Sequence, residues 1–195
     1  MSRADDIMDV ANHFILERGY SAFSYADISG EIGIQKASIH YHFPSKANLV
    51  QSVVSRYRRE VRANLSLLDS MTGAPQEKLE QYLNYWETCL QVRAMDICLC
   101  ALLASEVPIL PEEVRSEIQG HFQELTDWFT KLLLEAEQPL QYASSKLSAE
   151  EMAHAILAGI HGGMLAARTF DDVKHFQMVK KQLLQQLAVI PQTIN

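Results

Sequence analysis

The sequence predicts an all-α fold of about nine helices, and three observations support this class. Almost every segment repeats its apolar residues at intervals of three and four, whereas no segment alternates apolar and polar residues as a strand does. The 8 glycines and 6 prolines are few, and most fall between these segments. The chain has 195 residues and is 48% hydrophobic, which is enough to bury a sizeable core.

The first three helices are short and closely spaced. An apolar face within Ile7–Ile15 marks the first, which Gly19 should end as a C-terminal glycine. Two shorter helices are expected at about Tyr25–Ile32 and Gln35–Tyr41, with Gly33 in the turn between them.

A long fourth helix should begin after Ser45, a good N-cap residue, and keep an apolar face through Leu49–Leu68. The run 72–75, Thr-Gly-Ala-Pro, predicts the next break. A fifth helix should carry Leu79–Leu90, and a more apolar segment, Met95–Val107, follows it.

The remaining third of the chain also has helical spacing. An amphipathic helix is expected over Val114–Ala136, followed by a loop at 139–147. Ser148 and Glu151 have the spacing of a capping box, so they should begin a helix of many small residues that runs to about Thr169. A last helix is expected over Asp172–Val189.

The charge of the chain is unevenly distributed. The net charge is −7, but residues 1–64 have eight Lys or Arg against seven Asp or Glu. Between Lys36 and Arg62 six basic residues stand against one acidic residue. A local basic face is therefore available on an acidic protein. The basic residues in Arg56–Arg62 could contact DNA or form an ordinary solvated face.

The sequence predicts a soluble, cytoplasmic protein. No apolar run approaches the ~20 residues that cross a bilayer, and the first residues are polar and acidic, without an apolar signal region. The three cysteines, Cys89, Cys98 and Cys100, are odd in number and clustered, which does not suggest a disulfide framework.

A helix-turn-helix is the most specific motif. Residues 33–49 read Gly-Ile-Gln-Lys-Ala-Ser-Ile-His-Tyr-His-Phe-Pro-Ser-Lys-Ala-Asn-Leu, and they follow a short helix that ends at a glycine turn. In such a unit the second helix enters the major groove while its inward side chains pack on the first. Ile28, Ile39 and Phe43 are the expected inward residues.

This segment strongly resembles the TetR family of transcriptional regulators. The resemblance runs from about Arg3 to Tyr57. It includes Gly-Tyr-Ser-Ala-Phe-Ser at 19–24, Asp-Ile at 27–28 and the His-Phe-Pro-Ser-Lys-x-x-Leu run at 42–49. Residues 65–195 resemble the family only in their helical pattern and length.

The resemblance implies two domains and a function. Residues 1–48 would be the DNA-binding domain, with its helix-turn-helix core at 25–43, and residues 49–195 the ligand-binding and dimerisation domain. The protein would repress transcription as a homodimer on a palindromic operator and leave the DNA when a small-molecule effector binds. The sign of regulation is open, because the sequence does not exclude an activator.

The resemblance also implies particular DNA contacts. Ser24 and Tyr25 match phosphate-contacting positions, and Lys46 matches a lysine that meets phosphate. Lys36 could donate to guanine, and Gln35 could pair with adenine. The predicted DNA-binding residues are Ser24, Tyr25, Gln35, Lys36, Ala37, Ser38, His40, Tyr41, His42 and Lys46.

His40 departs from the family pattern, which usually has Tyr at this position. A histidine is shorter and can carry charge, so the family's base contacts are not carried over to it. Tyr41 and His42 match positions that either contact phosphate or pack.

A homodimer is expected because a single helix-turn-helix touches few bases. A stripe of small residues on one predicted helix and an apolar face on another could form a four-helix interface. The alternative is that the small stripe packs inside the monomer. The predicted interface residues are Phe122, Leu125, Phe129, Leu132, Ala155, Gly159, Gly163 and Ala167.

An effector pocket is expected in the C-terminal helices, where aromatic side chains with a few polar groups form the usual lining of a ligand site. Ordinary core packing is the alternative for each of these residues. The candidate lining residues are Tyr82, Tyr85, Trp86, Cys89, Leu99, Leu103, Phe122, Trp128 and His161. The ligand itself is not specified by the sequence.

Other functions have less support. Cys89, Cys98 and Cys100 could sense oxidants or electrophiles if a thiol had a lowered pKa, but inert buried cysteine is the alternative. The histidines show no metal-ligand spacing, and no phosphate loop or nucleophile elbow occurs. We therefore expect no enzyme activity, metal or cofactor. A ligand-free protein that organises DNA is the remaining alternative.

Overall fold

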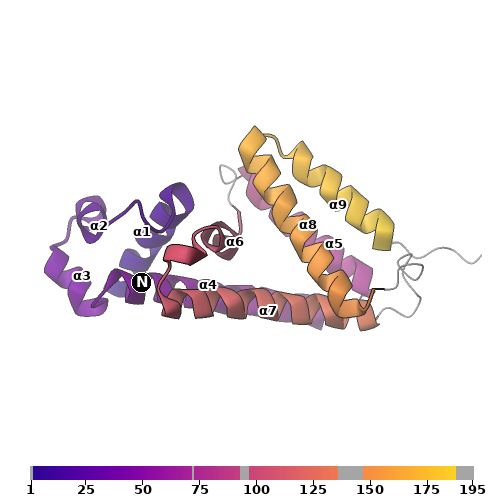
Figure 1. Ribbon diagram of the computed structural model, residues 1–195, viewed down its shortest axis with the longest axis horizontal. Coiled ribbons are helices and arrows are strands. Elements are labelled where there is room, and N and C mark those ends of the chain that lie inside the picture. The colour runs from indigo at the N-terminus through magenta and orange to yellow at the C-terminus, as the bar shows by residue number, and fades with distance from the viewer. Residues whose placement is uncertain (1, 72, 93–96, 136–146, 188–195) are drawn as a thin grey trace, which may run out of the picture. The chain divides into compact units, whose positions relative to one another are not determined.

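The computed structural model describes residues 2–71, 73–92, 97–135 and 147–187. Within these residues the regular structure consists of nine α-helices and one 3-10 helix, and no strand occurs (Figure 1). The predicted all-α fold is confirmed. Most of the predicted loop at 139–147, and the predicted helix ends at Ala136 and Val189, lie outside the described residues. No described helix is long and apolar enough to cross a membrane.

The chain forms two compact units. We call Met1–Ala63 with Cys98–Phe122 the head unit, and Asn64–Ile97 with Gln123–Asn195 the body unit. Two long helices, α4 (Lys46–Ser70) and α7 (Glu112–Glu135), contribute residues to both units. The predicted functional boundary after residue 48 stays a prediction.

The head unit begins with helices whose ends are set by local hydrogen bonds. They are α1 (Arg3–Arg18), α2 (Tyr25–Ile32) and α3 (Lys36–His42). Ser24 and Asp27 form a capping box that begins α2, and the side chain of Ser45 accepts from the backbone N–H of Asn48 at the start of α4. Gly33 has φ +67°, a left-handed conformation that allows the sharp turn from α2 to α3.

A second segment completes the head unit. It contains α6 (Leu99–Ala104), the 3-10 helix Val107–Ile109 and the first part of α7. Helix α1 packs against α2, α3 and α6. The fully buried side chains of the head unit come from both segments, and they include Ile7, Ile15, Ile28, Ile39, Leu49, Leu99 and Leu103.

An ion pair joins α4 to α7 inside the head unit. The guanidinium of Arg58 lies 2.5 Å from the carboxylate of Glu117, and both side chains are mostly buried. A Cβ atom at Gly120 would lie 2.5 Å from the Arg58 guanidinium. The absence of a side chain at Gly120 therefore lets Arg58 lie against α7.

The body unit is built around three helices, α5 (Pro75–Val92), α8 (Ala149–Phe170) and α9 (Lys174–Leu187), which lie side by side in Figure 1. The predicted capping box of Ser148 and Glu151 begins α8. Helix α8 packs most extensively on α9, and both also contact α5.

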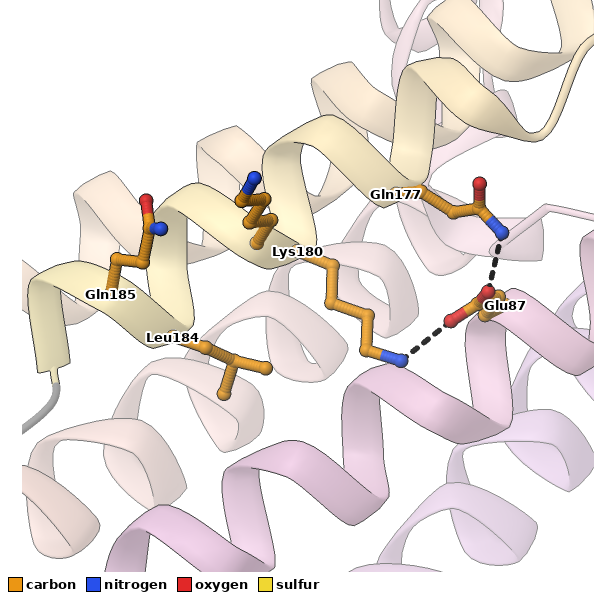
Figure 2. Close-up of a pocket in the computed structure, with 6 residues that line it drawn as sticks. Glu87, Gln177, Lys180, Leu184 and Gln185 are labelled. Atoms are coloured by element: carbon orange, nitrogen blue, oxygen red, sulfur yellow. Dashed lines mark hydrogen bonds and ion pairs between the residues drawn. The ribbon is translucent and has the colours of Figure 1, made fainter.

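Two polar contacts connect α9 to α5 beside a groove. Figure 2 shows Lys180 and Gln177 of α9 reaching Glu87 of α5, at 2.5 Å and 2.7 Å. The hydrogen bond from Lys180 holds the pKa of Glu87 below its usual value. These contacts hold α9 against α5.

Candidate nucleic-acid interface

Helix α3 presents one buried side and one exposed side. Ile39 is fully buried, and Phe43, which follows the helix, is also buried. These two residues attach α3 to the head unit, as the sequence predicts. The residues of this segment that are predicted to contact DNA are exposed or half-buried, namely Gln35, Lys36, Ala37, Ser38, His40, Tyr41 and His42.

Among the described residues of the head unit, Tyr41 is the most exposed large hydrophobic one, with 84% of its surface accessible. Its ring contacts that of His42 edge-on, with a centroid separation of 5.2 Å. His40 is also exposed, but its ring meets the edge of Tyr25 at 4.7 Å and its Nδ1 lies 3.4 Å from the carbonyl oxygen of Pro44. His40 is therefore held more firmly than Tyr41.

Tyr25 has a structural role within the head unit. It is buried, and its hydroxyl donates a 2.8 Å hydrogen bond to the carbonyl oxygen of Phe43. Burial raises the pKa of Tyr25 to about 12, so the hydroxyl keeps its proton. The hydroxyl therefore connects the start of α2 to the end of α3, and a phosphate contact by Tyr25 stays a prediction.

We predict that Tyr25→Phe destabilises the head unit by about 1–2 kcal/mol, since the buried Phe43 carbonyl loses its donor. Operator affinity, measured well below the unfolding temperature, should stay close to that of the native chain. Denaturant unfolding and a fluorescence anisotropy titration measure the two quantities. Tyr41→Phe, which alters an exposed hydroxyl, is the matched control and should leave stability unchanged. A large loss of affinity without a loss of stability in Tyr25→Phe would support a phosphate contact by the hydroxyl instead.

Lys46 and Ser24 already have partners within the chain. The amine of Lys46 donates to the backbone carbonyl of Phe23 and lies over the rings of Tyr20 and Phe23, at 4.8 Å and 4.1 Å. Burial lowers the pKa of Lys46, and the charge of Glu106 opposes this shift. Ser24 is exposed, but its hydroxyl donates to Asp27. Phosphate contacts by Lys46 and Ser24 stay predictions.

The predicted effector-lining residues are divided between the units. Leu99, Leu103 and Phe122 belong to the head unit, and the other six belong to the body unit. All except Tyr85 and Phe122 are buried, and Tyr85 is about half exposed. Among the described residues, the indole N–H of Trp86 is buried without a hydrogen-bond partner.

The three cysteines are free thiols in buried positions. Cys98 Sγ lies 3.4 Å from Nε2 of His121. Burial, reinforced by a hydrogen bond with Cys98, raises the pKa of the Cys100 thiol well above its usual value. Because the thiolate is the reactive form, this environment favours an inert Cys100. Within the described residues, no three His, Cys, Asp or Glu residues are grouped to hold a metal ion.

The predicted dimer interface requires a correction. Leu125, Phe129 and Leu132 are buried within the single chain, so they form its core.

The small residues of α8 mostly pack inside the chain as well. A Cβ at Gly163 would lie 3.1 Å from Val179 and 3.3 Å from Phe176, both on α9. Ala167 is also buried and Phe122 and Gly159 are half-buried, which leaves only Ala155 of the predicted set exposed. Most of the predicted stripe therefore packs inside the chain.

A neighbouring face of α8 is exposed instead. Nothing lies within 4 Å of a Cβ built at Gly162. The exposed positions recur at three- and four-residue intervals, at His154, Ala155, Ala158, Gly162, Leu165 and Thr169. We call this set the α8 face. The sequence pattern does not distinguish this face, because small residues occupy both sides of the helix.

Two short helices joined by a tight turn, with one side of the second helix exposed, are characteristic of a helix-turn-helix DNA-binding protein. Residues 7–53 match the family model "Bacterial regulatory proteins, tetR family". Residues 75–182 match "Transcriptional regulator LmrA/YxaF-like, C-terminal domain". The chain belongs to the TetR family of transcriptional regulators, whose members bind operator DNA as dimers and are not enzymes.

Individual relatives agree with this assignment. A TetR-family regulator from Agrobacterium tumefaciens is 40% identical, with 95% of this chain and 97% of that chain covered and a TM-score of 0.88. The negative regulator IcaR of the Staphylococcus aureus biofilm operon icaADBC is 26% identical over 84% of this chain and 83% of its own length. The repressor DhaR of a Mycobacterium species is 24% identical over 68% of this chain, and the match spans 66% of DhaR, just under two thirds.

Proposed function

We propose that this regulator represses transcription by binding a palindromic operator as a homodimer, and that a small-molecule effector in the body unit releases it. The observation that supports operator reading best is the exposed side of α3. Tyr41 is 84% exposed although Ile39, two residues earlier, is fully buried. Its ring contacts that of His42 but is otherwise largely accessible, and contact with DNA would cover it.

Two features support repression as the mode of regulation and DNA as the partner. IcaR is named a negative regulator and DhaR a repressor, and we extend repression to this chain from these relatives. Within the basic surplus between Lys36 and Arg62, the exposed Lys36, Arg59 and Arg62 offer charges for phosphate on a chain of net charge −7. Arg56 and Arg58 are paired with Asp9 and Glu117. A cytoplasmic location would follow from an operator as partner.

We assign the dimer contact to the α8 face. Its residues are small or apolar at Ala155, Ala158, Gly162 and Leu165, and small side chains let two helices approach closely. In a two-fold dimer the same patch meets itself, so two α8 helices would cross at this face. Helix α9 would border the contact, where Met178 is exposed.

We place the effector in the body unit on the evidence of Trp86. A buried indole N–H without a partner costs free energy, and a ligand with a hydrogen-bond acceptor would satisfy it. Tyr82 and Trp128 lie in the same unit, with ring centroids 5.7 Å apart, and provide aromatic surface. The expected effector is therefore a largely apolar molecule with an acceptor atom.

Selection of binding sites from random DNA tests the proposal. We expect an enriched palindrome with half-site centres about one helical turn apart, or a multiple of it. Affinity should fall steeply as salt rises, because neutralised phosphates release counterions. An enriched sequence without two-fold symmetry would contradict binding as a homodimer. With the operator in hand, a compound library can be screened for release, and the fluorescence of Trp86 and Trp128 reports binding to the body unit.

A further inference from the structure

The carboxylate of Glu106 is one of several contacts that link the two segments of the head unit. Glu106 lies between α6 and the 3-10 helix, and its Oε1 accepts a 2.8 Å hydrogen bond from the backbone N–H of Tyr20. Tyr20 is the second residue of the loop between α1 and α2, which we call the α1–α2 loop (residues 19–24). The contact thus joins the α6–α7 segment to the DNA-reading part of the unit.

The close approach depends on the residue before Tyr20. Gly19 has φ +81°, a conformation that favours glycine, and a Cβ at this position would overlap the carboxylate oxygen of Glu106. Two independent features, the hydrogen bond and this glycine, therefore place the carboxylate against the loop.

Lys46 also contacts the same loop. Its amine donates to the carbonyl of Phe23 and lies over the rings of Tyr20 and Phe23. The charge of Glu106 also favours the protonated form of Lys46. The loop leads directly into Ser24, the N-cap of α2. These two contacts therefore add to the packing of α1 in fixing the position of α2 and of α3 packed on it.

We propose that Glu106 is a positioning residue for operator binding and couples the α6–α7 segment to the helix-turn-helix. Because α7 is one continuous helix that runs from the head unit into the body unit, a shift of this helix can displace Glu106 and with it the α1–α2 loop. This inference rests on the proposed control of DNA binding by the body unit. Coupling between two sites is reciprocal, so operator binding must also act on the α6–α7 segment.

This reciprocity gives a test that needs no effector. Hydrogen exchange is measured with and without the operator selected from random DNA, in the native chain and in Glu106→Ala. In the native chain, operator binding should slow exchange both in residues 25–42 and in residues 99–110. In Glu106→Ala the effect at 99–110 should be lost while that at 25–42 remains. Operator affinity should fall about tenfold, because the loop must be ordered without its acceptor.

Two further variants separate coupling from a general structural role. Glu106→Gln keeps an oxygen that accepts from Tyr20, so it should retain the exchange pattern and bind within about threefold of the native affinity. Glu112→Ala removes an exposed carboxylate of the same segment and is the matched control, expected to match the native chain. The inference is overturned if Glu106→Ala keeps the operator effect at 99–110, whether or not its stability falls. It is equally overturned if Glu106→Gln loses that effect. Neither outcome bears on effector release, which is tested separately by the compound screen.

Discussion

Gly162→Glu is expected to convert the protein from a dimer into a folded monomer with greatly weakened operator binding. The site is exposed in the single chain and nothing lies within 4 Å of the new Cβ, so a glutamate fits there without strain. Glu also forms helix better than Gly by roughly 0.5–1 kcal/mol, which favours the monomer's fold. In a two-fold contact, however, two carboxylates would be buried together without partners.

The loss of DNA binding should follow from the loss of one half-site. Linking two DNA-binding units commonly raises affinity by about 10²–10⁴-fold, and a monomer loses this gain. Light scattering measures the oligomeric state, circular dichroism the fold, and anisotropy the operator affinity. Gly30→Glu is the control for oligomeric state, because Gly30 is another exposed helical glycine without atoms within 4 Å of its Cβ. A Gly162→Glu protein that remains dimeric would show that the α8 face is not the interface.

Gly163→Glu should fail for a different reason. Its Cβ would press on Val179 and on the fully buried Phe176, and the carboxylate would be buried within the chain. An unpaired buried charge commonly costs about 3–5 kcal/mol, so this variant should unfold at a much lower temperature. The contrast between adjacent positions separates loss of the dimer from loss of the fold.

Helix α8 illustrates what the sequence could and could not predict. The Ser148–Glu151 capping box and the helical spacing predict its start and length, because these signals are local. The choice of the inward face is not local. Both 155–159–163 and 155–158–162 are series of small residues, and only the position of α9 shows which of them is covered.

The helix-turn-helix shows the same division between local and long-range information. The two short helices and the buried Ile39 follow from periodicity and the turn at Gly33. The hydrogen bond from Tyr25 to Phe43 does not, since it joins residues whose distance depends on the angle between α2 and α3. Glu106 had no sequence signal, because a single glutamate beside a proline-containing segment has no distinctive pattern.

Lys36→Ala and Tyr41→Ala are expected to weaken operator binding while stability and the dimer stay intact. Both side chains are exposed on α3, and no described hydrogen bond to the rest of the head unit depends on either. A good base contact contributes about 1–3 kcal/mol, so a loss of roughly tenfold or more per half-site is expected if either residue reads a base. Lys181→Ala, which removes an exposed lysine from α9, is the control and should bind normally.

The salt dependence of these variants distinguishes how each residue contacts DNA. If Lys36 meets a phosphate, its removal weakens all sequences alike and reduces the slope of log affinity against log salt by about one per half-site. If it donates to guanine, the slope changes less, and discrimination at one operator position relaxes instead. Tyr41 carries no charge, so Tyr41→Ala should lower affinity with an unchanged slope. Native affinity in both variants would mean that the exposed side of α3 does not face DNA, and the reading surface would have to be sought elsewhere on the head unit.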